Sequence, residues 1–579
     1  MGDTGKKISR VYSNFRGVDF RGEEINLVRS PDSLNVWKDY SKTESIRTRP
    51  ALKKLRSGSD TVYGIYFFRG KTIVHQGTSL IEYDDIAADG LNFSILGTVF
   101  AAPSNGFVYE DKWYFKDGVN YLCYNGSSLY KVADNSYVPT TTIGRKPEGG
   151  GTVHEDVNML SPYRINTFLA DGIAKEYLLD TMNIDDDYVP VVKVNGETVI
   201  YAYANGTKTG NFEVDYKAGK ITFKTAPLAP NTDGQDNVSI RFKKDVIEYR
   251  EAIEKSTLLQ VFDNRVFFSG NKEHPNVVWH CSLNDPSYVS DRDYYNEGMD
   301  EAAVKGMVAG NNALWVFREP SDSNTNVFYH TPTIDDVYGK IYPSSHSSVT
   351  AGCVGKAINF NDDIVFFSER GMEGISGDIT TEQVLAHRST MVDGKMMGIS
   401  RKVYEKMVLV EWEGYLLVFI GSMVFLADSR AVFTNENHIE YEWFYWELEK
   451  DVTCAKVHDG LLYVGTEDGG VYTLNDYSYT TPLESYWVTP KDKFEYPHML
   501  KTTNKRGCVA EAMGDIEVYA KLEDTGFELI GKYEDVKDYF VSRIKRKKFK
   551  DIQLKFRSNT GFSLETVTLE AWIGGYIKR

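Results

Sequence analysis

The residues MVLVEWEGYLLVFIGSMVFLA, numbers 407–427, contain three apolar runs separated by two short turns. The runs are Met407–Val410, Tyr415–Ile420 and Met423–Ala427, and the turns are Glu413-Gly414 and Gly421-Ser422. Runs of this length that are rich in Val, Phe and Tyr predict β-strands, and glycine permits tight turns between them. Because the runs are almost continuously apolar rather than alternating, we expect strands that are buried on both faces. This stretch therefore predicts an antiparallel meander inside a packed all-β fold.

The same arrangement of strand, small turn and strand recurs along the chain. It is found at Val62–His75, Gly106–Val132, Leu258–Phe268, Leu314–Phe317, Ile364–Phe367 and Trp443–Tyr472. A spacing of roughly 40–50 residues between such units is typical of β-propeller blades. Six or seven units fit the pattern, without a WD or kelch signature. The sequence therefore predicts a six- or seven-bladed β-propeller. Within the second unit, Asn125-Gly126 predicts a type I′ hairpin turn.

Residues 155–246 interrupt this series with a cleanly alternating pattern. The side chains of Val192, Val194, Ile221 and Phe223 are expected on one face of their strands, because successive residues of a strand point to opposite faces. The dipeptides Asn195-Gly196, Asn205-Gly206 and Ala218-Gly219 supply turns between the strands. About six strands in this segment predict an Ig-like β-sandwich, inserted in a loop of the propeller.

The two ends of the chain form separate predicted regions. Residues 1–58 lack strand alternation, and we expect an extended N-terminal arm that packs on the body through Phe15, Leu34 and Trp37. Residues 481–579 alternate again and predict a C-terminal β-sandwich. The propeller then occupies residues 59–154 and 247–480, on either side of the inserted sandwich.

Composition narrows the class of protein. The chain has 579 residues, a formal net charge of −16 and five scattered cysteines. The negative charge disfavours long-range attraction to DNA phosphates. The cysteine spacing indicates neither a zinc site nor a disulfide framework, and we expect reduced, mostly buried thiols. We expect no signal peptide and no membrane-spanning segment, because no apolar run approaches 18 residues.

Four groups of residues could carry chemistry, and each has a structural interpretation beside the functional one. Asp185-Asp186-Asp187 could bind calcium, although a solvated acidic loop is the better interpretation. Lys545-Arg546-Lys547-Lys548-Phe549-Lys550 could contact DNA phosphates, or form a solvated face or a subunit contact. Glu411 and Glu413 could share a strand face as a glycosidase pair, and Trp443 to Trp446 could stack on sugars but fit a core better. No zincin, hydrolase or P-loop motif occurs. We expect no catalytic residue, metal or cofactor.

Three segments resemble virion proteins of tailed phages. The first, with Arg16-Gly17-Val18, Ser30 to Trp37 and Arg47 to Leu52, resembles the starts of hub and nozzle proteins of short-tailed phages. The second resembles an inserted phage module, at Phe168–Gly172, Val192–Gly196 and Gly219–Phe223, with Leu169-Ala170 departing from its usual pattern. The third, from Asn264 to Tyr288, resembles a blade of phage propeller proteins. The resemblance implies a homo-oligomeric ring, often a hexamer, around the DNA exit channel.

The expected function is structural. We expect a non-enzymatic hub or nozzle ring in the virion tail, assembled in the host cytoplasm, that extends and gates the DNA channel below the portal. Its expected partners are further copies of itself, portal or adaptor proteins, other tail proteins, and double-stranded DNA passing without sequence-specific binding. A carbohydrate-binding receptor module at the tail tip, marked by exposed aromatic residues in the insert, is the alternative. A propeller glycosidase is the weaker alternative.

Overall fold

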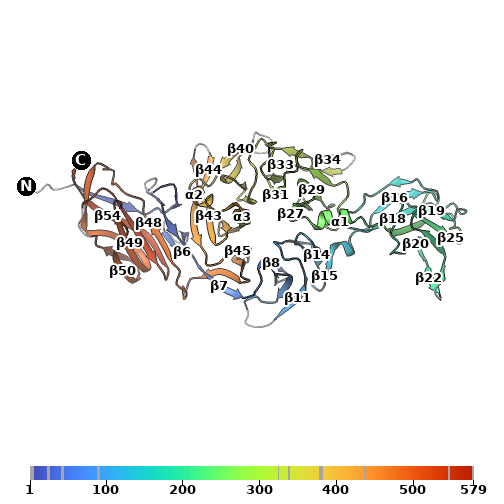
Figure 1. Cartoon of the computed structure of the whole chain (residues 1–579), viewed down its shortest axis with the longest axis horizontal. Helices are drawn as coiled ribbons and strands as arrows, with labels where there is room; N and C mark the ends of the chain where they lie inside the picture. The colour runs from blue at the N-terminus through green and yellow to red at the C-terminus, as the bar shows by residue number, and fades with distance from the viewer. Residues whose placement is uncertain are drawn as a thin grey trace, which may run out of the picture. The chain divides into compact units, whose positions relative to one another are not determined.

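The computed structural model describes residues 6–22, 27–40, 45–87, 92–204, 207–323, 325–336, 339–376, 383–435, 438–544 and 548–576. Strands dominate these residues. The helices among them are α1 (Ile247–Glu254), α2 (Asp393–Met396), α3 (Arg401–Tyr404) and the 3-10 helix η1 (Val132–Asn135). The predicted all-β class is therefore confirmed (Figure 1). No helix in this part of the chain is long and apolar enough to cross a membrane.

The chain divides into two compact units. The first unit holds residues 1–103, 319–327 and 346–579, and the second holds residues 104–318 and 328–345.

Four four-stranded antiparallel sheets lie among the described residues of the first unit. They contain β8 (Val62–Phe68), β9 (Lys71–Gln76), β10 (Ser79–Tyr83) and β11 (Phe93–Thr98); β37 (Ala357–Phe360), β38 (Asp363–Ser368), β39 (Gly371–Ser376) and β40 (Val384–His387); β41 (Val408–Trp412), β42 (Tyr415–Ile420), β43 (Met423–Asn435) and β44 (His438–Glu447); and β45 (Val452–His458), β46 (Leu461–Thr466) and β47 (Val471–Asp476) with β7 (Ala51–Arg56). Buried side chains join neighbouring sheets face to face. Phe367 packs in one cluster with Val418, and Trp446 packs in another with Val464. A third cluster joins β8–β10 to β47. The four sheets therefore form one stack.

Three further four-stranded sheets lie wholly or mostly in the second unit, within its described residues. They contain β12 (Asn105–Tyr109), β13 (Lys112–Lys116), β14 (Tyr121–Tyr124) and β15 (Leu129–Lys131); β27 (Leu258–Phe262), β28 (Arg265–Ser269), β29 (Val277–His280) and β30 (Tyr294–Asn296); and β31 (Val304–Gly310), β32 (Ala313–Arg318), β33 (Val327–His330) and β36 (Ser344–His346). Tyr121 and Phe268 share one buried cluster, and Phe267 and Leu314 share another. These sheets form a second stack. The strands β34 (Thr333–Asp335) and β35 (Gly339–Ile341) make a separate hairpin.

Two-residue turns with left-handed backbone join many of these strands. Glu413-Gly414 has φ values of 51° and 74°, as a type I′ turn requires. Asn125-Gly126 does not form the predicted type I′ turn, because Asn125 is not left-handed. Its side-chain Oδ1 instead accepts the backbone N–H groups of Ser127 and Ser128, both at 2.9 Å. The hairpin there has a four-residue loop, since a local side-chain bond competes with the tight turn.

Residues 140–246, here called the insert, form two packed sheets and a hairpin. The six-stranded sheet contains β17 (Thr152–Val153), β16 (Thr140–Arg145), β18 (Tyr163–Phe168), β26 (Val238–Lys243), β20 (Val191–Val194) and β21 (Glu197–Val199), in that order. The three-stranded sheet contains β19 (Glu176–Leu178), β25 (Lys220–Phe223) and β24 (Phe212–Asp215), and the hairpin contains β22 (Tyr201–Ala204) and β23 (Thr207–Gly210). Val192, Ile221 and Phe223 are buried in one cluster, which confirms their predicted inward face. The predicted turn at Asn195-Gly196 is confirmed, with φ values of 51° and 83°, and Asn205-Gly206 lies outside the described residues.

The predicted start of the insert at residue 155 leaves out β16 and β17, which pair within the same sheet. β16 reads Thr-Thr-Thr-Ile-Gly-Arg, so it lacks the apolar alternation that marks a strand in sequence.

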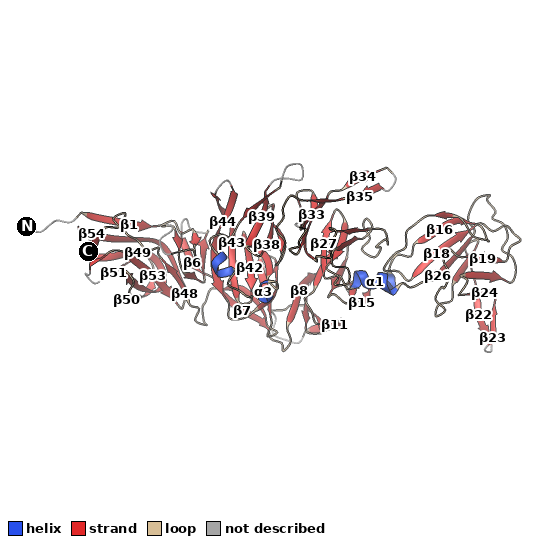
Figure 2. Ribbon diagram, turned by 45° about the horizontal axis from the view of Figure 1, so that its top comes forward, coloured by secondary structure: helices blue, strands red, loops and turns tan. Residues whose placement is uncertain are grey.

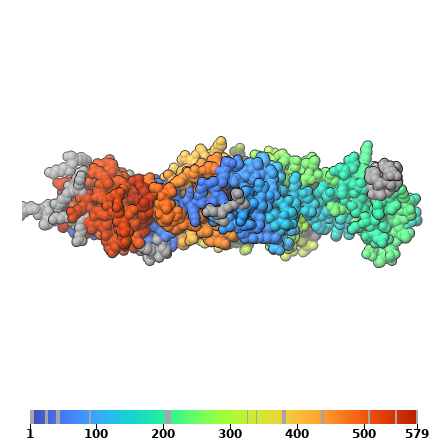
Figure 3. Space-filling model, turned by 90° about the horizontal axis from the view of Figure 1, so that it is seen from below, coloured from blue at the N-terminus to red at the C-terminus, as the bar shows by residue number. Residues whose placement is uncertain are grey.

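The C-terminal residues form an eleven-stranded sheet within the described part of the first unit. Its strands are β48 (Ser485–Val488), β49 (Met499–Leu522), β50 (Glu528–Val536), β51 (Tyr539–Ser542), β52 (Lys548–Phe549), β53 (Ile552–Ser558) and β54 (Phe562–Tyr576), with β1 (Lys7–Tyr12), β4 (Ser33–Leu34), β5 (Val36–Asp39) and β6 (Ser45–Thr48). Figure 2 shows the long strands β49 and β54 running side by side. In Figure 3 the C-terminal residues, at the red end of the colour scale, form one continuous block.

Residues 1–58, predicted as one extended arm, therefore contribute strands to more than one sheet. β1 pairs with β54 and β7 pairs with β47, while β2 (Gly17–Val18) and β3 (Arg29–Ser30) pair with each other. Phe15 and Trp37 are buried as predicted, and Leu34 is partly buried. β1 and β7 were missed because their partners lie hundreds of residues away, where local alternation carries no signal.

Candidate functional site

Two of the three predicted calcium ligands contact other protein groups. The Asp187 carboxylate forms an ion pair with Lys243, and Asp185 Oδ2 accepts the backbone N–H of Asp245 at 2.9 Å. Among the described residues, no group of three His, Cys, Asp or Glu side chains could hold a metal ion. The geometry favours the solvated acidic loop over the calcium site.

The predicted basic run is described only in part. Lys545, Arg546 and Lys547 lie outside the described residues. Lys548 is exposed on the short strand β52, where the neighbouring Phe549 is buried. The contact of this run with DNA therefore stays a prediction.

The predicted glycosidase pair does not share a strand face. Glu411 lies in β41, but Glu413 occupies the first position of the turn after it, with φ of 51°. Both side chains are exposed. The prediction that they share a face is wrong, because the strand ends at Trp412.

The aromatic residues Trp443 to Trp446 are core residues, since each is at most 1% exposed. Exposed aromatic residues were expected in the insert if it binds sugars. Within the described part of residues 155–246, the exposed large apolar side chains are aliphatic, with Ile173 at 83% and Leu228 at 72% as the most exposed.

The N-terminal segment, which includes residues of the phage resemblance, packs closely against β44. This contact, made by Gly17, Arg29 and Arg49, is here called the interlock. Gly17 has φ of +123°, and a Cβ atom there would lie 2.2 Å from the Trp443 carbonyl oxygen. Arg29 makes two hydrogen bonds, at 2.7 and 2.6 Å, to the buried carboxylate of Glu442. Bidentate arginine–carboxylate pairs are strong and geometrically specific. Glycine and arginine at these positions therefore hold the N-terminal segment against the sheet.

Arg49 extends the interlock by bonding backbone groups. Its guanidinium donates to Asn35 Oδ1 at 2.8 Å and to the carbonyl oxygens of Pro50 and Glu447, both at 2.9 Å. Burial lowers the pKa of Arg49 to about 10. Asn35 is left-handed, with φ of 56°, and its Oδ1 also accepts the backbone N–H of Glu447 at 3.0 Å. The residues of the resembling motif thus satisfy buried backbone groups.

A serine, a histidine and two carboxylates meet beside β39, although no motif indicated them. His387 Nε2 lies 2.6 Å from Asp393 Oδ2, and its Nδ1 lies 3.3 Å from Glu373 Oε2. Burial opposes the charge on His387, but bonds to the two carboxylates outweigh it and raise the pKa to about 9. Ser389 Oγ donates to Asp393 Oδ1 at 2.6 Å rather than to the histidine. A nucleophilic serine needs a hydrogen bond to the histidine that acts as its base. Ser389 lacks that bond, so the four side chains form a hydrogen-bonded ion cluster.

A second buried polar cluster lies between β27–β30 and β31–β36. His330 Nε2 is 2.8 Å from Glu297 Oε1, and both side chains have no exposed surface. Ser344 Oγ donates to the other oxygen of Glu297 at 2.7 Å. Nearby, burial lowers the pKa of His280 to about 4 and raises that of Asp293 to about 6. The pair of Glu297 with His330 joins the sheet of β27–β30 to the sheet of β31–β36.

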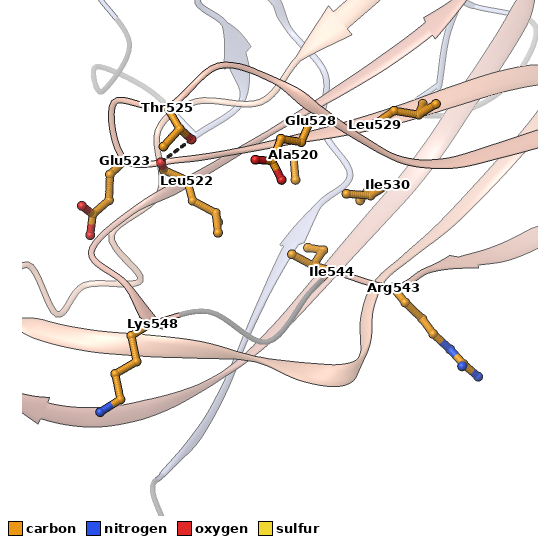
Figure 4. Close-up of a pocket in the computed structure, with 10 residues that line it drawn as sticks. All are labelled: Ala520, Leu522, Glu523, Thr525, Glu528, Leu529, Ile530, Arg543, Ile544 and Lys548. Carbon is orange, nitrogen blue, oxygen red and sulfur yellow. Dashed lines mark hydrogen bonds between the residues drawn. The ribbon is translucent and has the colours of Figure 1, made fainter.

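A hollow of about 270 Å³ opens beside β49 and β50, here called the C-terminal hollow. Leu522, Ile530 and Ile544 form its apolar floor, and Figure 4 shows them converging from three segments. Arg543 and Lys548 extend from its rim (Figure 4). Sequence reasoning missed it because its lining comes from strands and a loop that only pairing brings together.

Comparisons with known proteins return structures alone. The chain matches no family model and no curated protein. It is similar to BamB from Moraxella catarrhalis at 9% identity, covering 76% of this chain and 96% of that one, with a TM-score of 0.33. It is also similar to YCF48 bound to D1 peptide, at 7% identity over 74% of this chain and 98% of that one, with a TM-score of 0.32. The β-propeller domain of Cps50 (Swd1) from Myceliophteria thermophila matches at 12% identity over 48% and 72%, with a TM-score of 0.22. TM-scores this low carry no argument about function.

Proposed function

We propose that this chain is a structural, non-enzymatic protein of a tailed-phage virion that forms an oligomeric hub or nozzle ring below the portal. The observation that carries the proposal is the interlock, because the segments that resemble phage hub and nozzle proteins supply Gly17, Asn35 and Arg49 to it. Gly17 and Arg49 hold positions where another side chain would clash or leave buried groups unpaired. Because the resemblance includes positions on which the packing depends, it supports a fold in common with phage hub and nozzle proteins.

We infer further that the seven four-stranded sheets of the described residues are the blades of one propeller. The pairing of β7 with β47 joins an early strand to the last of these sheets, and such a joint closes a ring of blades. The insert then enters between the blades of β12–β15 and β27–β30 as a β-sandwich.

The proposed ring would act physically on the DNA. With a net charge of −16 on every copy, its surface repels phosphate at long range, so a duplex slides through rather than binds. The non-enzymatic part of the proposal is supported by the exposed Glu411 and Glu413 and by the bond from Ser389 to Asp393 rather than to His387.

Localisation in particles tests this proposal directly. Virions purified from infected cells would be analysed by mass spectrometry and by electron microscopy with an antibody to this chain. We expect the chain in particles, with label at the junction of head and tail. Detection only in the soluble fraction of infected cells, with none in purified particles, would contradict the proposal.

A further inference from the structure

The helix α1 connects β26, the last strand of the insert, to β27 in the neighbouring sheet. Figures 1 and 2 show α1 between β15 and the insert. Its residues Ala252 and Ile253 are buried in one cluster with Tyr121 and Phe268, which belong to the sheets of β12–β15 and β27–β30. The core of the insert is a separate cluster, whose members lie between residues 168 and 242. The packing of α1 therefore fastens one end of the insert to two sheets.

Lys116, the last residue of β13, holds the C-terminal end of α1. Its side chain is buried, and Nζ donates to the carbonyl oxygens of Ile253 at 2.5 Å and Glu254 at 3.1 Å. Asn271, in the loop after β28, donates from Nδ2 to the carbonyl oxygen of Ala252 at 3.0 Å. The last carbonyl groups of a helix have no partner within it, so these bonds satisfy three of them in succession. Two sheets thus supply the cap of α1.

The Lys116 amine donates to neutral acceptors, since its hydrogen bonds end on carbonyl oxygens. Nζ also lies 5.1 Å from the ring centre of Tyr121 and 5.7 Å from that of Phe268. Aromatic faces attract a cation, but they do not replace the water that hydrates an ammonium ion. A charged Lys116 is therefore poorly solvated while α1 is closed over it.

The carboxylates of Glu254 and Asp117 favour a positive charge on Lys116. Glu254 Oε2 also lies 3.9 Å from Arg250 Nε, and Asp117 Oδ1 accepts the backbone N–H of Asn120 at 2.6 Å. Burial opposes the charge more strongly and lowers the pKa of Lys116 to about 7. Burial likewise raises the pKa of the Glu254 carboxyl group. The closed site therefore stabilises the free amine relative to the ammonium ion.

We propose that Lys116 is a proton-controlled latch on α1: the free amine holds the helix against the two sheets, and uptake of a proton releases the helix. Opening of α1 brings the amine into water, where an ammonium ion is hydrated. Opening therefore binds a proton, and α1 opens more often as the pH falls toward 7. The latch uses contacts of the second unit, so it is independent of the virion role.

A second attachment of the insert is made by an amide, which does not titrate. Asn158 is buried, donates from Nδ2 to the carbonyl oxygen of Ser287 at 2.9 Å and accepts the backbone N–H of Val289 at 3.1 Å. The N–H of Met159 donates to the carbonyl oxygen of Val289 at 2.7 Å. This attachment should stay closed when α1 opens, so it serves as the reference for a local opening.

Hydrogen exchange of the full chain, followed by mass spectrometry at pH 7.0 and 8.5, tests the latch. Each exchange rate is divided by that of an unstructured peptide at the same pH, which gives a protection factor. The protection of the α1 amides should rise by roughly tenfold or more from pH 7.0 to 8.5, because the closed site loses its proton in this window and the open one does not. At pH 7.0 the α1 amides should also be less protected than those of Met159 and Val289, since α1 opens by itself.

Two variants identify the group that titrates. Lys116→Met keeps the length of the side chain without the amine, so its α1 protection should be equal at the two pH values. Lys255→Met is the matched control, because Lys255 is exposed and pairs with Glu251 and Glu273, and it should keep the rise of the wild type. Circular dichroism melts verify that each variant folds.

Three results would overturn the latch. The first is wild-type α1 protection that is equal at the two pH values, and this comparison decides the proposal even if a variant fails to fold. The second is a rise that persists in folded Lys116→Met. The third is equal protection of α1 and of Met159 and Val289 at pH 7.0, which would show that α1 opens only when the whole unit unfolds.

Discussion

Substitution of Gly17 by alanine should detach the N-terminal segment from the sheet. At φ of +123° a residue with a side chain is strained by about 1–3 kcal/mol. The added Cβ would also lie 2.2 Å from the Trp443 carbonyl oxygen, so the two backbones must separate by about 1 Å to reach an ordinary carbon–oxygen contact. That shift stretches the hydrogen bonds between Arg29 and the buried Glu442 carboxylate, now 2.6 and 2.7 Å. Together these effects should lower the free energy of unfolding by about 3–5 kcal/mol.

Urea unfolding followed by tryptophan fluorescence measures this loss, because Trp37, Trp443 and Trp446 are all buried near the contact. The matched control is Gly70→Ala. Gly70 is also left-handed, with φ of +74°, but its added Cβ meets nothing within 4 Å. It should therefore cost only the backbone strain, about 1–2 kcal/mol. Equal losses for the two variants would refute the argument that close approach to β44 dictates the glycine at position 17.

Three further predictions follow from the buried charges and from the insert. Lys116 donates to the carbonyl oxygens of Ile253 and Glu254 at the end of α1, and burial lowers its pKa to about 7. The unfolded chain then binds more protons between pH 7 and about 10, so stability should rise with pH in that window, and Lys116→Met should abolish the rise measured by urea unfolding. The pKa of His387 is raised to about 9, so its contribution to the free energy of unfolding is complete below about pH 6.5 and is lost as pH rises through 9. In the same measurement, the His387→Asn variant should not show this decrease in stability. Residues 138–246 alone should melt cooperatively by circular dichroism, because every member of their core cluster lies between 168 and 242. Residues 155–246 lack β16, which pairs with β18, and should therefore melt at a lower temperature. Equal melting temperatures would contradict the role given to β16.

Local patterns were enough to predict individual hairpins. The run at Val62–Phe68 is β8, and Arg69-Gly70, with φ values of 50° and 74°, is the turn that leads into β9. A continuous apolar run and the turn residues that follow it lie within a few positions of each other, so both are evident in a short stretch of sequence. The same holds for the three strands predicted between residues 407 and 427, with two differences. β41 begins one residue later and ends two residues after the predicted run, and β43 continues beyond Ala427 to Asn435.

Pairings between distant segments could not be predicted in this way. Arg29 and Glu442, or β1 and β54, are brought together only when complete sheets form, and nothing in either segment specifies its partner. The His387 cluster and the C-terminal hollow were missed for the same reason. Each collects side chains from several elements, so its chemistry is a property of packing rather than of any short motif.

The pairing of β7 with β47 also determines when one sheet can form during synthesis of the chain. Arg56 of β7 lies opposite Val471 of β47, so roughly 400 residues must be synthesised after β7 before its partner exists. At about 5–20 residues per second, β7 leaves the ribosome tens of seconds before it can pair. An unpaired strand during that time invites aggregation, and the exposed Lys53 and Lys54 of β7 are the kind of charge that keeps such an edge from pairing wrongly. This sheet is therefore completed late in synthesis. In any nascent chain that stops before residue 471, β7 has not yet acquired its partner strand.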